Sequence, residues 1–162
     1  MKTNCYILEK DNKVIIIDPG EDADKIEKEL KNKKVLGVVI THYHYDHVGA
    51  LSRIINKYKC NIYDYYSLEE KEYIIENFKF EVIFTPGHCL DSISLYFKED
   101  KKYFTGDFLF KETVGRCDLP TSSFDEMKKS IEKIKKYPEG NVYPGHGSST
   151  TLSHEIKYNP YF

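Results

Sequence analysis

The sequence predicts an α/β protein in which two β-sheets face each other and helices cover their outer sides. Three observations predict this arrangement. The first half of the chain alternates strands with helices, the second half is rich in short β-prone runs before one clear helix, and many of these runs end at Gly or Pro. Apolar runs that stop at such residues are typical of buried strands that lead into loops.

The first strands and helix follow from residue spacing. Residues 3–10 and 12–20 predict a hairpin whose turn lies at Lys10–Asn12. Residues 22–33 predict an amphipathic helix. Its apolar face would hold Ala23, Ile26 and Leu30. The run VLGVVI at 35–40 predicts the next strand, so the order strand, helix, strand indicates an α/β unit.

The middle of the chain continues this alternation. A helix is expected at 48–58 and a strand at 60–64. A further helix is expected at 67–78, because Ser67 and Glu70 fit a capping box. The apolar side of that helix would hold Leu68, Ile74, Ile75 and Phe78.

The second half is expected to supply the other sheet. Strands are predicted at 80–84, 92–97 and 101–105. The last clear helix follows Ser123, which fits a capping pattern with Glu126. Spacings of four and three predict the buried face of this helix, formed by Met127, Ile131 and Ile134.

Length and composition predict one soluble globular domain over residues 1–162. The chain has 40% hydrophobic and 31% charged residues, which is ordinary for a folded protein. A formal net charge of -2, with lysines interleaved among acids, predicts no attraction to nucleic acid. No apolar run has the length of a signal peptide or of a membrane span, so the expected location is the cytoplasm, with no membrane partner.

The cysteines agree with that location. Cys5, Cys60, Cys89 and Cys117 are scattered and form no CxxC pair that would indicate a structural zinc site or a redox dithiol. Cys89 and Cys117 lie close in sequence to candidate ligands. For each of them a small buried apolar side chain is favoured over a redox-sensitive thiol.

The densest group of candidate ligands lies in the segment THYHYDHVGA at 41–50. It places His42, His44, Asp46 and His47 around one turn, directly after an apolar run. Three imidazoles and a carboxylate this close together are costly to hold unless a cation lies among them. The segment therefore predicts a metal site just before the next helix, whose N-terminus would offer backbone donors near the metal.

Three later strand ends carry similar residues. In the motifs FTPGH, FTGD and YPGH, an apolar or aromatic run ends at His88, Asp107 and His146, respectively. Groups on loops at strand ends can converge on one point above a rigid sheet. Because five of the six histidines fall at these positions, metal binding is favoured over capping or surface roles.

The ordered set HxHxDH, His88, Asp107 and His146 resembles the metallo-β-lactamase superfamily over nearly the whole chain. Within it, the chain is most similar to small hydrolases of the glyoxalase II type. This resemblance rests on the short sequence motifs NCYIL, IDPG, TPGH, TGDFLF, GRCDLP, PGHG and NPYF. The resemblance implies an αββα sandwich of two mixed β-sheets flanked by helices. It also implies a metal site along one edge of the paired sheets.

The resemblance further implies ligands for two divalent metal ions. The terminal ligands of one ion would be His42, His44 and His88. Those of the other ion would be Asp46, His47 and His146. Asp107 would bridge the two ions, and His154 matches no ligand position. Zinc is the default metal, although iron or manganese can occupy such mixed nitrogen and oxygen sites.

The implied activity is that of a dinuclear metal-dependent hydrolase of thioesters, with hydroxyacyl-thiol conjugates such as lactoyl-thiols as first substrates. Two cations can share a hydroxide near neutral pH, and that hydroxide would attack the carbonyl.

The catalytic residues would be Asp107 and Asp46, the latter either as a plain ligand or also orienting the hydroxide. Asp18 is expected to fix a metal-binding imidazole. Strand propensity is favoured over hydrogen bonding for the threonines before ligand loops, Thr41, Thr85 and Thr105.

Two departures from glyoxalase II bear on the substrate. Its lysine and tyrosine that contact glutathione fall at Arg116 and Asp118 here. Arg116 keeps a positive charge and is a candidate substrate-binding residue, whereas Asp118 would repel a carboxylate. The helical C-terminal domain that completes the glutathione pocket is not expected within 1–162. The pocket should therefore be more open or be completed by a second subunit, so a homodimer is one expectation.

Other functions stay open at this stage. A mononuclear iron persulfide dioxygenase shares the fold and would use His42, His88 and Asp107, a set that suits iron and oxygen chemistry. The motifs TGDFLF and GRCDLP favour the hydrolase over the dioxygenase. The expected location disfavours a β-lactamase, and the charge balance disfavours a nucleic-acid-processing enzyme. A non-catalytic binding module would leave the full ligand set unexplained.

Overall fold

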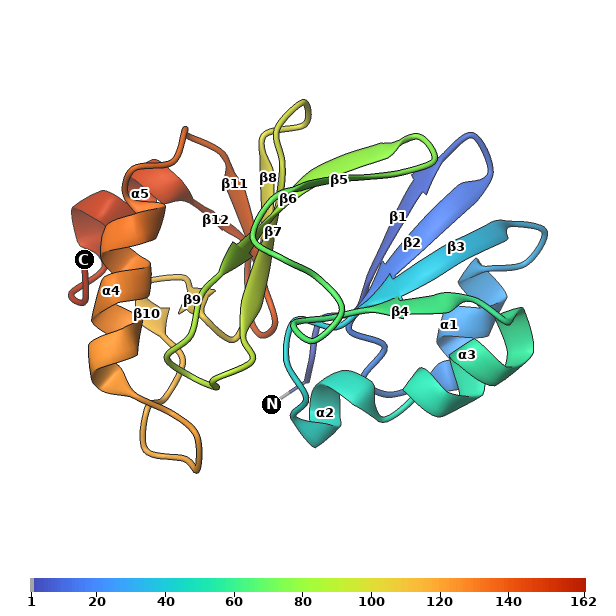
Figure 1. Ribbon diagram of the computed structural model, residues 1–162, viewed down its shortest axis with the longest axis horizontal. Coiled ribbons are helices and arrows are strands. Elements are labelled where there is room, and N and C mark those ends of the chain that lie inside the picture. The colour runs from blue at the N-terminus through green and yellow to red at the C-terminus, as the bar shows by residue number, and fades with distance from the viewer. Residues whose placement is uncertain (1) are drawn as a thin grey trace.

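Two β-sheets pack face to face in the computed structural model, which describes residues 2–162 (Figure 1). In spatial order, the first sheet holds β1 (Tyr6–Lys10), β2 (Lys13–Ile17), β3 (Lys34–Val39) and β4 (Asn61–Tyr63). The second holds β12 (Thr150–Thr151), β11 (Asn141–Pro144), β8 (Lys102–Gly106), β7 (Ile93–Phe97), β6 (Phe78–Phe84) and β5 (Glu72–Ile75). A separate short hairpin pairs β9 (Leu109–Phe110) with β10 (Thr113–Val114).

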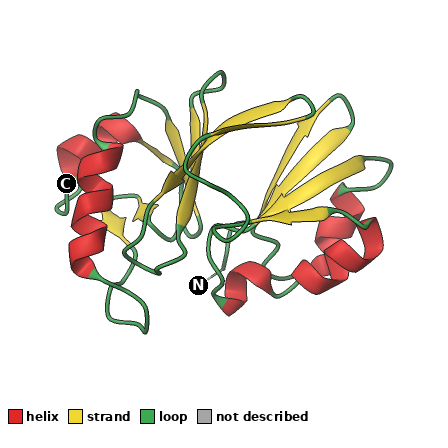
Figure 2. Cartoon of the chain, viewed as in Figure 1, coloured by secondary structure: helices red, strands yellow, loops and turns green. Residues whose placement is uncertain are grey.

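Helices lie on the outer sides of both sheets (Figure 2). The first sheet is covered by α1 (Ala23–Glu29) and α3 (Leu51–Tyr58), and the second by α4 (Phe124–Ile134) and α5 (Leu152–Tyr158). A four-residue helix, α2 (Tyr45–Val48), lies at the end of the sandwich where the N-terminus is also found. Both sheets mix parallel and antiparallel pairs, so the predicted αββα sandwich is confirmed.

Strand β2 shows why the middle layers are apolar throughout. Val14 and Ile16 pack with the α1 and α3 side of the first sheet, whereas Ile15 and Ile17 belong to the core between the sheets. None of the four is more than 1% exposed. Because side chains alternate along a strand, a strand covered on both faces needs an apolar residue at every position.

The helix expected at 67–78 is wrong. Residues 72–84 form the hairpin of β5 and β6, with Glu76 at a φ of 52° in its turn. Tyr73 and Ile75 pack against the core between the sheets, so the apolar side chains follow the two-residue period of a strand. Ser67 caps no helix, because its hydroxyl accepts a hydrogen bond from the backbone N–H of Asp64 at 2.9 Å.

Most of the other predicted elements are confirmed. The first hairpin turns at Asp11 and Asn12, whose φ angles of 52° and 58° suit a two-residue turn. Helix α4 begins as predicted, since the Ser123 hydroxyl accepts from the backbone N–H of Glu126. Helix α5 was not predicted from the sequence. No helix within residues 2–162 has the length and apolar character that crossing a membrane requires.

Candidate metal centre

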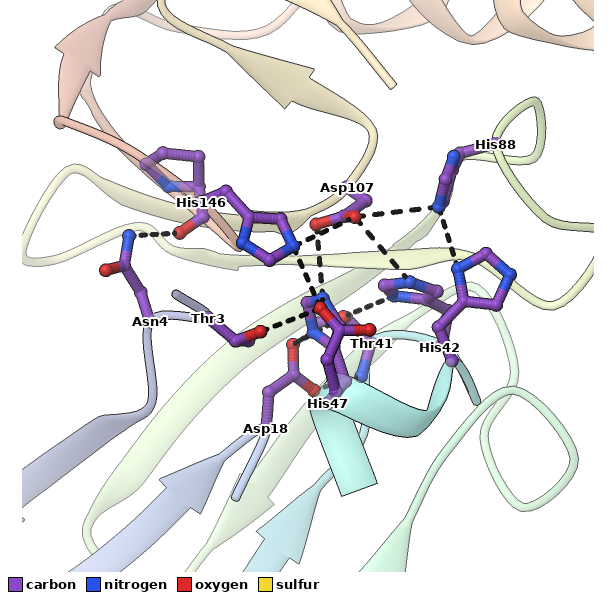
Figure 3. Close-up of polar contacts among 12 residues, drawn as sticks. Thr3, Asn4, Asp18, Thr41, His42, His47, His88, Asp107 and His146 are labelled. Atoms are coloured by element: carbon purple, nitrogen blue, oxygen red, sulfur yellow. Dashed lines mark hydrogen bonds and ion pairs between the residues drawn. The ribbon is translucent and has the colours of Figure 1, made fainter. Parts of the chain in front are cut away.

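Five strands bring their carboxyl ends to the same edge of the sandwich, near α2. The loops after β2, β3, β6, β8 and β11 carry, in turn, Asp18, the segment 41–47, His88, Asp107 and His146. Figure 3 shows these side chains facing one another across the space between the sheets. The carboxyl ends of strands are where open α/β sheets bind ligands. The expected metal centre is therefore one compact group of side chains.

The first donor group contains His42, His44 and His88. The Nδ1 atom of His44 lies 3.0 Å from Nε2 of His88, and the ring centre of His42 lies 4.8 Å from that of His44 and 5.1 Å from that of His88. Together with Cys89, these residues offer donor atoms within 4.8 Å of one another. Three imidazoles from two separate loops are thus positioned to hold one ion.

The second donor group contains Asp46, His47 and His146. The Oδ2 atom of Asp46 lies 3.1 Å from Nε2 of His146 and 3.7 Å from Nε2 of His47. Asp46 and His47 belong to α2, so the histidine cluster runs into this short helix instead of ending before it. The group is positioned to hold a second ion.

Asp107 lies between the two groups. Its Oδ2 is 3.5 Å from Nε2 of His88, 3.9 Å from Nε2 of His42 and 3.4 Å from Nε2 of His146. Its Oδ1 is 3.2 Å from Nε2 of His47. One carboxylate therefore faces imidazoles of both donor groups, which is the position that a bridging ligand requires.

Unpaired buried atoms test whether these residues fit metal ions. Four side-chain atoms of the described residues are buried without a hydrogen-bond partner, and three of them lie in the site, namely Nε2 of His42, Nε2 of His47 and Oδ1 of Asp107, while the fourth is Oδ1 of Asn77. The His47 and Asp107 atoms are near each other but lack the geometry of a hydrogen bond. Buried polar atoms left unpaired are costly and rare in native proteins. Since imidazole nitrogen and carboxylate oxygen suit zinc, iron and manganese, a pair of divalent ions fits this site.

The ionisation of two histidines supports that fit. Burial and the neighbouring His47 lower the pKa of His42. Burial also acts to lower the pKa of His47, but the carboxylates of Asp107 and Asp18 outweigh it and raise this pKa to about 10. The two carboxylates therefore favour positive charge at His47, which a bound cation would supply.

Asp18 contacts the imidazole of His47, one of the candidate ligands. Its Oδ2 lies 2.8 Å from Nδ1 of His47, and it is 2% exposed. The backbone N–H and the hydroxyl of Thr41 donate to Asp18 at 2.8 and 2.6 Å. Thr41 therefore supports the site through hydrogen bonds, and the preference for strand propensity is wrong for this residue. The hydroxyl of Thr85 is hydrogen-bonded to Ser94 and that of Thr105 to the carbonyl of Leu109, and neither partner is a candidate ligand.

Several supporting residues were missed from the sequence. The Thr3 hydroxyl donates to Oδ2 of Asp46 at 2.7 Å, and the side-chain amide of Asn4 donates to the carbonyl of Pro144 at 3.1 Å (Figure 3). The backbone N–H of Asn4 also donates to the carbonyl of Gly145 at 2.7 Å. Backbone carbonyls hold two imidazoles, since Nδ1 of His146 lies 2.9 Å from the Lys2 oxygen and Nδ1 of His88 lies 2.8 Å from the Arg116 oxygen. A carbonyl leaves no signal in the residue type.

Gly145 is needed for close approach at the centre. A Cβ atom there would lie 2.3 Å from Oδ1 of Asp107 and 2.7 Å from Cε1 of His47. Any side chain there would therefore displace the carboxylate of Asp107. In the PGH motif, His146 is thus a candidate ligand, and Gly145 leaves the space that the neighbouring Asp107 carboxylate occupies.

Cys89 lies against the first donor group. Its sulfur is 3.2 Å from Nε2 of His44, and the residue is 3% exposed. Burial raises the pKa of the Cys89 thiol to about 12. This fits the preferred interpretation of a small buried side chain. Cys117 is half-buried, and its thiol donates to the carbonyl of Gly115.

Arg116 lies at the rim of a cavity of about 630 Å³ beside the metal centre. Its guanidinium pairs with both carboxylate oxygens of Asp118, at 2.6 and 2.7 Å. The two residues at the glutathione-contact positions therefore neutralise each other. His154 lies apart from the donor groups, with Nε2 2.9 Å from Oε1 of Glu112.

The sequence comparisons place this fold and site in a class. The family model of the metallo-beta-lactamase superfamily matches residues 1–70 and 64–146, and the chain belongs to this superfamily. A probable metallo-hydrolase of Streptococcus pyogenes serotype M6 is 33% identical over 198 residues, which cover 98% of this chain and 85% of the relative. Hydroxyacylglutathione hydrolase GloC of Haemophilus influenzae is 29% identical over 197 residues, which cover 98% and 92%. The resemblance to glyoxalase II-like hydrolases is confirmed, and these relatives support a metal-dependent hydrolase.

Solved structures give the same class. The crystal structure of BLEG-1 B3 metallo-beta-lactamase superposes with a TM-score of 0.94 at 30% identity, covering 98% of this chain and 93% of that one. The structure of TTHA1623 in a di-iron-bound form superposes with a TM-score of 0.89 at 28% identity, covering 99% and 95%. The fold therefore supports divalent metal binding, with zinc and iron both open.

Proposed function

We propose that the protein is a dinuclear metal-dependent hydrolase that cleaves hydroxyacyl thioesters. The position of Asp107 supports this most directly, because its two oxygens lie 3.2 to 3.9 Å from imidazole nitrogens of both donor groups. A mononuclear centre needs no carboxylate between two such groups. The ligand set proposed from the resemblance thus agrees with the two groups of side chains.

The chain's residues would hold the ions and arrange the reactants. One ion would be held by His42, His44 and His88, the other by Asp46, His47 and His146, and both by Asp107. When bound, such ions lower the pKa of water to about 7 and polarise a carbonyl oxygen. Asp46 is the more accessible acid, with 40% of its side chain exposed against 10% for Asp107. Held by the Thr3 hydroxyl, Asp46 is suited to orient a water molecule or to accept its proton.

The substrate class rests on the relatives and on the cavity. GloC of Haemophilus influenzae is named a hydroxyacylglutathione hydrolase, and it spans this chain almost completely. The cavity beside the metal centre lies within the size range of small-molecule sites. Zinc stays the first metal to test and iron the second, because of the di-iron form of TTHA1623. The cytoplasmic location and the homodimer stay predictions from the sequence.

Metal content and substrate panels test the proposal together. Protein purified without chelator should contain about two divalent ions per chain by elemental mass spectrometry, and it should release thiol from lactoyl thioesters. A β-lactam and a glutathione persulfide, the latter with an oxygen electrode, serve as competing substrates. Absence of turnover on every thioester by metal-replete protein would sink the proposal. One iron per chain with oxygen consumption would instead identify the persulfide dioxygenase.

A further inference from the structure

The cavity beside the metal centre has two unlike walls. One wall is formed by His88, Asp107 and His146 of the donor groups, and another by the β9–β10 hairpin through Phe110 and Lys111. Its volume of about 630 Å³ far exceeds what a three-carbon hydroxyacyl group fills. If the acyl carbonyl lies at the metal centre, most of the remaining space is available to the thiol carrier.

The hairpin leads away from the metal centre toward Lys111. Phe110 pairs with Thr113, so Lys111 and Glu112 form a two-residue turn, with Glu112 at a φ of 59°. The base of the hairpin joins Asp107 on one side and Arg116 on the other, whose carbonyl holds His88. Lys111 is therefore at the tip, at the far end of the hairpin from the ligands.

Helix α5 fixes the position of that tip. Glu155 is 0% exposed, and its carboxylate accepts from the backbone N–H of Glu112 at 2.8 Å. The Asn159 amide donates to the carbonyl of Thr113 at 3.1 Å and to Glu155 at 2.8 Å. Buried hydrogen bonds of this kind make the tip a preorganised part of the wall and not a mobile loop.

The charges on the cavity wall are not balanced. Arg116 is paired with Asp118, and the Glu112 carboxylate is paired with His154. Within residues 2–162, no carboxylate oxygen lies within 4.0 Å of the Lys111 amine. Lys111 is thus a cation on the cavity wall without a counter-charge, held apart from the metal ligands.

From this arrangement we infer that Lys111 determines specificity by binding an anionic group on the thiol carrier of the substrate. The inference rests on the proposed thioester hydrolysis. It assigns recognition of the carrier's charge to the hairpin tip and not to Arg116, whose charge Asp118 already neutralises. Carriers with a carboxylate should be preferred over neutral carriers of the same shape.

A matched pair of substrates measures this preference. Lactoylglutathione and its dimethyl ester have the same acyl group and carrier skeleton but differ in carboxylate charge. The holoenzyme should favour the carboxylate form in kcat/KM, and Lys111→Glu should reduce that ratio about tenfold through KM, since an attraction becomes a repulsion. Lys136→Glu makes the same charge change on an exposed residue outside the cavity, and it should leave the ratio at the parent value.

Calorimetric titration of glutathione and its dimethyl ester keeps the inference separate from the proposed function. Parent protein should bind the carboxylate form more tightly, and Lys111→Glu should lose this difference even if no thioester is turned over. Turnover of both thioesters with the same ratio in parent and Lys111→Glu would overturn the inference and leave the proposed function standing. Equal binding of the two carriers by the parent would also overturn it.

Discussion

The two ends of the sandwich use polar residues in different ways. Near α2, the strand ends bury donor atoms that lack protein partners, among them Nε2 of His42 and Nε2 of His47. At the opposite end, where β2, β3 and β6 begin, exposed charges satisfy one another. There Glu76 pairs with Lys13 and with Lys34, which is 2.9 Å away. The unpaired atoms at the first end belong to groups that could hold a cation, whereas Oδ1 of Asn77, which is also buried without a partner at the second end, belongs to no such group among the described residues.

Because of this contrast, substitutions at the two ends of the same strands should affect different properties of the protein. Substitutions near α2 should change metal binding and turnover, and their effects should depend on which contact is lost. Substitutions at the opposite end should change only stability, by small amounts, because exposed ion pairs contribute little. Four variants test how sharply the two ends differ.

Asp107→Ala should have the largest effect. It removes the carboxylate that faces both donor groups, so the ion content should fall from about two per chain and thioester turnover should be abolished. Elemental mass spectrometry and thiol release measure the two results on the same sample. Asp100→Ala, at the opposite end beside Lys10, is the matched control and should keep both. An Asp107→Ala protein that retains two ions and full turnover would contradict the bridging position.

Asp18→Asn should come next. The amide keeps the size of the side chain but loses the charge that holds His47 and accepts from Thr41. Partners of metal-binding imidazoles typically contribute 10- to 100-fold in metal affinity, so a loss of about that size is expected. Competition with a chromophoric chelator measures it. Unchanged affinity would show that His47 does not need this carboxylate.

Glu155→Gln should have an intermediate effect of a different kind. Its carboxylate accepts from Thr150, Glu112 and Asn159, and an amide nitrogen cannot accept at the same position. The free energy of unfolding should fall by about 1–3 kcal/mol, the cost of leaving a buried donor unsatisfied. Because the hairpin tip loses its support, KM for lactoylglutathione should rise by a larger factor than kcat falls. Denaturant titration and steady-state kinetics check these results, and a loss confined to kcat would argue against a role in substrate binding.

Glu76→Gln should have the smallest effect. Hydrogen bonds from Lys13 and Lys34 lower the pKa of Glu76 from 4.5 to about 2. A lowered folded-state pKa stabilises the protein above the unfolded value, so this contribution is present above about pH 4.5 and disappears as the pH falls toward 2. The variant should melt slightly earlier at neutral pH and low salt, and the difference should vanish in high salt. Altered metal content in this variant would contradict the separation of the two ends.

The donor residues could be predicted from the sequence because each follows a strand and carries a diagnostic side chain. The residues that support them could not. Thr3 and the Lys2 carbonyl reach their partners only after the sheets have packed, and nothing in the local sequence marks them. The sequence predicts a helix at 67–78 because Ser67 and Glu70 fit a capping pattern, but β5 and the turn that leads into β6 lie there instead. Core packing of Tyr73 and Ile75 outweighed that local signal.

The contact between His146 and the Lys2 carbonyl sets an order of events during protein synthesis. The two residues are 2.9 Å apart in space and 144 residues apart in the chain. At roughly 5–20 residues per second, a ribosome needs about 7 to 30 s to make the second after the first. The second donor group cannot close before His146 has left the ribosomal tunnel. The second donor group is therefore complete only after residue 146 has been made, however early the first strands of the chain have folded.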